Sequence, residues 1–204
     1  MEIRWLGRST FEIKSSVGVV VVDHEGALPS DSELEDENTI FVFSQKDRSE
    51  IPLNDYHVLT GPGEYEIGGI SIRGIASPAD DPSVSKEINT VYAIVTDGLH
   101  VVSLGTLGKT LSAQSIQQIA RVDVLLVNTS NHGLESEDLA SVVRSLEPKV
   151  VVPTGFDTAS SKPSAEMGQL LTELGVKEYE PVARLNVTKS NLPEERQVVV
   201  VQQI

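Results

Sequence analysis

The sequence contains no cysteine, so disulfide bonds, thiolate metal sites and cysteine nucleophiles are excluded. Aromatic residues make up only 4% of the chain, which indicates a core of aliphatic side chains. Basic residues are few as well: 16 Lys and Arg stand against 30 Asp and Glu, for a formal net charge of -14. Because such a charge repels nucleic-acid phosphates and anionic membrane surfaces, we expect neither nucleic-acid nor membrane binding.

Long apolar runs and targeting patterns are also missing. No apolar run approaches the ~18–20 residues that span a bilayer. The first residues, Met1–Trp5, lack the basic region and apolar stretch of a signal peptide. With 204 residues, 39% of them hydrophobic, the chain is predicted to fold as a single domain over residues 1–204 and to be cytoplasmic.

The chain changes its pattern near the middle. The first half is rich in extended segments, including a hairpin in which Asp97-Gly98 is a typical two-residue turn. The segment Tyr65–Ile75 is predicted as one strand that carries Gly68 and Gly69. The second half alternates strands with helices expected at residues 112–120, 136–146 and 165–174. This order predicts two sheets with helices packed outside them.

Several short motifs follow one another in an order that resembles a known family. Trp5-Leu-Gly-Arg-Ser-Thr-Phe11 is similar to the opening Trp-Leu-Gly-His-Ser-x-Phe of metallo-β-lactamase-fold hydrolases, and the motifs Asn89-Thr-Val-Tyr92 and Leu104-Gly-Thr-Leu-Gly108 have counterparts there. The resemblance is to the branch of predicted zinc-dependent hydrolases that are L-ascorbate-6-phosphate lactonase-like. It implies an α/β (α+β) fold, the four-layer αββα sandwich.

The resemblance also implies where metal ligands would stand. In the family, a His-x-His-x-Asp-His loop, an aspartate in Leu-Gly-Asp-Leu-Gly and a histidine after Ile-Pro-x hold the metal. Zinc needs three or four imidazole nitrogens or carboxylate oxygens that converge on it. No histidine stands at any of these places, so we expect no bound metal and no cofactor. The positions are occupied by Gln45, Asp47, Ser49, Glu50, Thr106 and Gly155.

Two hypotheses about function therefore stay open. The lost ligands favour a non-catalytic protein that binds a small molecule or a protein partner. The alternative is a metal-dependent hydrolase of a phosphorylated sugar, lactone or ester, with zinc in an atypical site. Asp47 could contribute to that site, and further cleft candidates are Asp23, His24, Asp80 and His132.

The last apolar segment adds an expectation about assembly. Val198–Val201 is predicted to be an exposed edge strand, and such strands often pair with another chain. The segment therefore favours a homo-oligomer.

Overall fold

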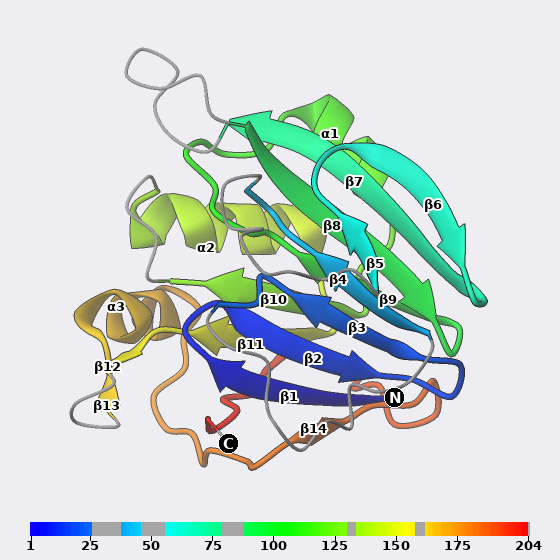
Figure 1. The fold of residues 1–204 in the computed structure, drawn as a ribbon. Helices are drawn as coiled ribbons and strands as arrows, with labels where there is room; N and C mark the ends of the chain where they lie inside the picture. Colours follow the sequence, from blue (N-terminus) through cyan, green and yellow to red (C-terminus); the bar gives the residue numbers. More distant parts are fainter. Residues whose placement is uncertain (26–37, 46–55, 79–87, 130–133, 158–161, 204) are drawn as a thin grey trace.

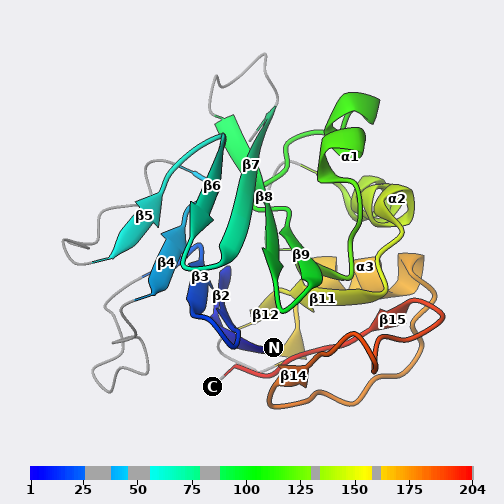
Figure 2. The same ribbon diagram turned by 90° about the vertical axis from the view of Figure 1, so that its right-hand side faces the viewer.

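The structure is a computed structural model that describes residues 1–25, 38–45, 56–78, 88–129, 134–157 and 162–203. Two β-sheets lie face to face, with the described helices on the outer side of one of them (Figures 1 and 2). The six-stranded sheet has the order β14-β1-β2-β3-β4-β5. Its strands are β1 (Glu2–Gly7), β2 (Thr10–Lys14), β3 (Val19–Val22), β4 (Thr39–Val42), β5 (His57–Leu59) and β14 (Leu185–Asn186).

The seven-stranded sheet has the order β15-β11-β10-β9-β8-β7-β6. Its strands β9, β10 and β11 run parallel to one another, whereas β6, β7, β8 and β9 form an antiparallel meander. The strands are β6 (Gly63–Ile67), β7 (Ile70–Pro78), β8 (Ile88–Thr96), β9 (Leu99–Ser103), β10 (Val124–Asn128), β11 (Val150–Thr154) and β15 (Gln197–Val198). A small separate pair, β12 (Phe156–Asp157) and β13 (Lys162–Pro163), follows β11.

The main core lies between the two sheets, and alternation along each strand decides which residues enter it. In β3, Val20 and Val22 belong to this central cluster, while Val19 and Val21 pack on the other face of the sheet. All four valines are buried, which explains why β3 is a continuous β-branched run instead of an alternating one.

The described helices cover the outer face of the seven-stranded sheet (Figure 2). They are α1 (Ala113–Ile119), α2 (Ser136–Leu146) and α3 (Ala165–Glu173). The helix α1 begins where Ser112 accepts a hydrogen bond from the Ser115 N–H, and α3 begins where Ser164 accepts one from Met167. Facing sheets with outer helices confirm the predicted α+β sandwich class.

The hairpins show where local sequence was decisive. Asp97 and Gly98 both have positive φ and join Thr96 to Leu99, which confirms the predicted turn. The prediction of one strand over Tyr65–Ile75 was wrong, because Gly68 and Gly69, with φ of +56° and +84°, form a second two-residue turn between β6 and β7. Paired glycines adopt these angles without a Cβ penalty.

The apolar C-terminal segment begins as the edge strand β15, as predicted, but its last apolar side chains are buried instead of exposed. β15 pairs with β11, and Val200 and Val201 are each only 1% exposed. The apolar side chains of this segment therefore pack against other parts of the same chain. Among the described residues, no helix is long and apolar enough to cross a membrane.

Candidate functional site

The candidate site lies where the carboxyl ends of several strands meet. The parallel strands β9, β10 and β11 end together at one edge of their sheet, and β3 and β4 end together in the other sheet. The N–H of Thr90, near the start of β8, donates to the carbonyl of Ser44 at 2.8 Å and joins the two sheets there. The described positions among those that the family uses for metal, Gln45, Thr106 and Gly155, therefore lie at one end of the sandwich.

Asp23 holds the loop that follows β4. It is 2% exposed, has a φ of +47°, and its Oδ1 accepts a hydrogen bond from the Ser44 N–H at 2.6 Å. Gln45 follows directly and is half-buried. The Asp23 carboxylate thus anchors the chain just before the first of the expected ligand positions.

His24 packs against an aromatic side chain of β4. It is 4% exposed, and its ring lies edge-on to Phe41 with the ring centroids 6.0 Å apart. Phe41 belongs to the cluster on the outer face of the six-stranded sheet, away from the central core. This position fits a packing role for His24.

Asn89 organises the loop that carries Thr106. Its amide nitrogen donates to the Leu104 carbonyl at 2.9 Å and to Ser77 Oγ at 2.8 Å, and its Oδ1 accepts from the Thr106 N–H at 2.7 Å. A side chain at Gly105 would overlap Asn89 and Ser44, so glycine is required there. A neutral amide and its backbone partners therefore fill the region around the place of the bridging aspartate.

Gly155 is packed directly against Thr129, which follows β10. Gly155 has a φ of +135°, and a Cβ at this position would overlap Thr129 Oγ1 and lie 3.3 Å from Thr129 Cβ. The Thr129 hydroxyl in turn donates to the carbonyl of Thr154, and the Ser164 N–H donates to the Gly155 carbonyl at 2.7 Å. Where the family has its last histidine, this chain has a glycine in close contact with a neighbouring threonine.

The remaining sequence candidates lie outside the described residues: Asp47, Ser49, Glu50, Asp80 and His132. Within the described ranges, no three or more histidines or carboxylates are grouped so that they could hold a metal ion. Gln45, Thr106 and Gly155 offer neither imidazole nor carboxylate. The described part of the site does not fit the dinuclear zinc centre that the family resemblance implies.

Tyr92 joins the two sheets beside this site, a role that the sequence motif alone did not reveal. The side chain is fully buried; its hydroxyl accepts from the Gly61 N–H at 2.9 Å and lies 3.2 Å from the carbonyls of Phe43 and Leu59, to either of which it can donate. Burial raises the pKa of Tyr92 above its ordinary value, against the lowering effect of the Gly61 hydrogen bond. A neutral tyrosine therefore ties the ends of β4 and β5 to β8.

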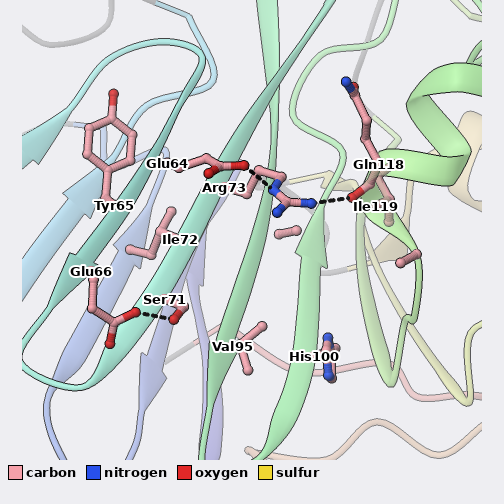
Figure 3. Close-up of a pocket in the computed structure, with 12 residues that line it drawn as sticks. Glu64, Tyr65, Glu66, Ser71, Ile72, Arg73, Val95, His100, Gln118 and Ile119 are labelled. Carbon is pink, nitrogen blue, oxygen red and sulfur yellow. Dashed lines mark hydrogen bonds and ion pairs between the residues drawn. The ribbon is translucent and has the colours of Figure 1, made fainter.

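A second concave surface lies on the outer face of β6, β7, β8 and β9, beside the end of α1 (Figure 3). It is an open groove of about 450 Å³. Arg73 crosses it, with an ion pair to Glu64 at 3.0 Å and a hydrogen bond to the carbonyl of Gln118 at 3.1 Å. Glu66 lies along the same strand as Glu64 and contacts Ser71. Because two glutamates and a single arginine line it, the groove is a poor anion site.

Comparisons with known proteins agree with this fold. The model of the beta-lactamase superfamily domain matches residues 2–155. A protein from Thermotoga maritima, classed as a zinc-dependent hydrolase of the metallo-beta-lactamase superfamily, has a structure similar to all of this chain, with a TM-score of 0.76, 23% identity and 99% of its own length covered. No curated protein matches the sequence.

More distant structures share the fold. A metallo hydrolase from the archaeon Ignicoccus hospitalis gives a TM-score of 0.57 at 18% identity, covering 92% of this chain and 99% of that one. A metallo-beta-lactamase fold protein from Bacillus subtilis gives a TM-score of 0.58 at 9% identity, covering 98% and 96%. The structural matches show that this chain has the metallo-β-lactamase fold, and the family model over residues 2–155 shows that it belongs to the beta-lactamase superfamily.

Proposed function

We propose that this protein is a non-catalytic member of the superfamily that acts by binding a small molecule or a protein partner. The observation that supports this most directly is the contact between Gly155 and Thr129. At the position where the family has its last histidine, this chain has Gly155, and Thr129 occupies the space where a Cβ would stand. The replacements at Gln45 and Thr106, which carry neither imidazole nor carboxylate, support the same conclusion.

The chemistry of the family explains why these replacements matter. Its hydrolases use a metal that lowers the pKa of bound water to about 7, which supplies hydroxide at neutral pH. The ligands must be deprotonated imidazoles, carboxylates or thiolates in a converging arrangement. The described residues at this end of the sandwich are instead engaged with the backbone: Asp23 with Ser44, and Asn89 with Leu104 and Thr106.

Metal content tests the proposal. The protein, expressed without a tag in medium supplemented with zinc, manganese and iron, should contain less than about a tenth of an equivalent of any metal by elemental analysis. It should also show no metal-dependent hydrolysis of lactones, phosphorylated sugars or simple esters.

Two substitutions distinguish this proposal from the alternative, a metal-dependent hydrolase with an atypical site. Binding of about one or two equivalents of metal, lost in His24→Ala or in His132→Ala, would establish an atypical hydrolase site and overturn the proposal. If both variants retain the same low metal content as the unsubstituted protein, the non-catalytic assignment stands.

A further inference from the structure

The strand β6 is an edge of the seven-stranded sheet, on the opposite side of the sheet from β15. In the part of the chain that the structure describes, β7 is the only strand that pairs with it. It lies at the margin of the ribbon in Figure 1, far from the described helices α2 and α3. An unpaired edge of this kind presents a row of backbone hydrogen-bonding groups to another chain.

The register of the hairpin shows which groups point outward. Ile67 and Ile70 flank the two-residue Gly68-Gly69 turn and form a hydrogen-bonded pair, and such pairs alternate along an antiparallel ladder. Glu64 and Glu66 fall on the alternate positions, opposite Arg73 and Ser71. Their N–H and C=O groups therefore point away from β7, toward the open side.

The side chains of the same two residues give this edge its charge. Glu64 and Glu66 are both exposed on the outer face, while Tyr65 between them is half-buried and packs against the central core. Arg73 pairs with Glu64, but the two side chains are 49% and 76% exposed. An exposed ion pair of this kind is weak, so Glu64 can also pair with a cation of a partner. Figure 3 shows the Glu64 carboxylate beside Arg73 and the Glu66 carboxylate beside Ser71, both on the β7 side of the strand.

A second copy of this chain is a poor occupant of the edge. Within β6 only Glu64 and Glu66 offer outward backbone groups, so an antiparallel pairing of two β6 edges sets glutamate opposite glutamate. Like charges directly opposite one another destabilise a strand pair. The formal net charge of -14 adds to the repulsion between copies and attracts a cationic partner.

We propose that β6 binds an extended basic peptide segment of a partner protein by adding it as a further strand. The recognised segment has a basic residue opposite Glu64, an apolar residue opposite Tyr65 and a basic residue opposite Glu66. Backbone hydrogen bonds supply the pairing, and alternate side chains supply the specificity. This surface is separate from the candidate metal end of the sandwich, so the inference does not depend on the proposed function.

A designed peptide tests the pattern. We would titrate acetyl-Thr-Val-Lys-Val-Lys-Val-Thr-amide into isotope-labelled protein and follow the amide resonances of Glu64 and Glu66 together with the dissociation constant. Both resonances should shift in a saturable manner. Affinity should fall as ionic strength rises from about 0.01 M to about 0.15 M, because the Debye length shortens from about 30 Å to about 8 Å.

The chain supplies a matched control, because the tripeptide Glu-Tyr-Glu occurs twice. Glu178 and Glu180 flank Tyr179 outside any strand, and both are exposed. The double variant Glu64→Gln/Glu66→Gln should weaken binding at least about threefold, from the loss of two cross-strand charge pairs. The double variant Glu178→Gln/Glu180→Gln changes net charge equally and should leave the affinity within experimental error.

Two further peptides separate strand addition from simple charge attraction. Methylation of both lysine backbone nitrogens keeps the charge but removes two backbone donors, so binding should be abolished. Replacement of both lysines with glutamate should abolish it as well. The proposal is overturned if the methylated or the acidic peptide binds as well as the basic one. Equal losses in the two glutamine variants, or a β6-paired dimer of this chain, would overturn it too.

Discussion

Substitution of Gly155 by alanine should be strongly destabilising, because the change meets two separate penalties. The φ of +135° is a region that residues with a Cβ avoid, at a cost of about 1–3 kcal/mol. The new Cβ would also overlap Thr129 Oγ1 in a packed region, which adds about 1–3 kcal/mol of displacement. We expect the free energy of unfolding to fall by about 2–6 kcal/mol in Gly155→Ala.

A double-mutant cycle separates the two penalties. Thr129→Ala alone loses the hydroxyl hydrogen bond to the Thr154 carbonyl and should cost about 1 kcal/mol. In Thr129→Ala/Gly155→Ala the overlap with Thr129 Oγ1 is gone, while the backbone penalty, the lost hydrogen bond and the 3.3 Å approach to the Cβ of residue 129 remain. The double variant should therefore be about 1–3 kcal/mol more stable than the sum of the single effects predicts.

Urea unfolding followed by far-ultraviolet circular dichroism measures these differences, provided that the slope m stays constant. Gly168→Ala is the matched control, since a Cβ there meets nothing within 4 Å and the residue lies inside α3. That variant should be about 0.5–1 kcal/mol more stable than the unsubstituted protein. If Gly155→Ala proves as harmless as Gly168→Ala, or if the cycle is additive, the close contact with Thr129 is refuted.

Two further predictions concern buried and paired titratable groups. Tyr92→Phe should lower the unfolding free energy by about 1–3 kcal/mol at pH 7, because the Gly61 N–H loses its acceptor. Since folding raises the pKa of Tyr92, the contribution of its hydroxyl to the free energy of unfolding is complete below the unfolded pKa of about 10 and is lost as the pH rises above it. In urea unfolding, the difference in stability between the unsubstituted protein and Tyr92→Phe should therefore narrow above pH ~10. A difference that stays constant would contradict this. Burial alone would raise the pKa of Asp97, but hydrogen bonds from Ser16 and the charge of the Met1 ammonium group outweigh it and lower the pKa. Asp97→Asn should therefore be less stable than the unsubstituted protein at neutral pH, and thermal unfolding should show the two converging as pH falls below about 3.9; a difference that persists in acid would count against the ion pair.

Much of the fold could be predicted because local sequence and tertiary structure agree. The β-branched run of β3 is buried on both faces, and the Asp97-Gly98 turn has the positive φ values that its residues favour. Gly68-Gly69 was missed as a turn because the apolar residues around it continue the strand pattern. The burial of Val200 and Val201 was missed because an apolar segment does not itself indicate which surface covers it.

The candidate site could likewise be predicted from the sequence only in part. The side chains at Gln45, Thr106 and Gly155 can be read directly from the sequence. The contact of Gly155 with Thr129 cannot, because 26 positions separate them and only the parallel pairing of β10 with β11 brings them together. The three hydrogen bonds of Asn89 likewise depend on neighbours from β7 and from the loop after β9.

The contact of Gly155 with Thr129 also affects how this lineage can evolve. Because the φ at Gly155 is +135° and a Cβ there would overlap Thr129 Oγ1, a mutation to histidine at that position meets both penalties. A histidine there would need a second change at Thr129, and the intermediate with only the first change is less stable than the present chain. Proteins survive only above a threshold of stability, so selection removes such intermediates. Position 155 is therefore expected to remain glycine in descendants of this chain unless Thr129 changes first.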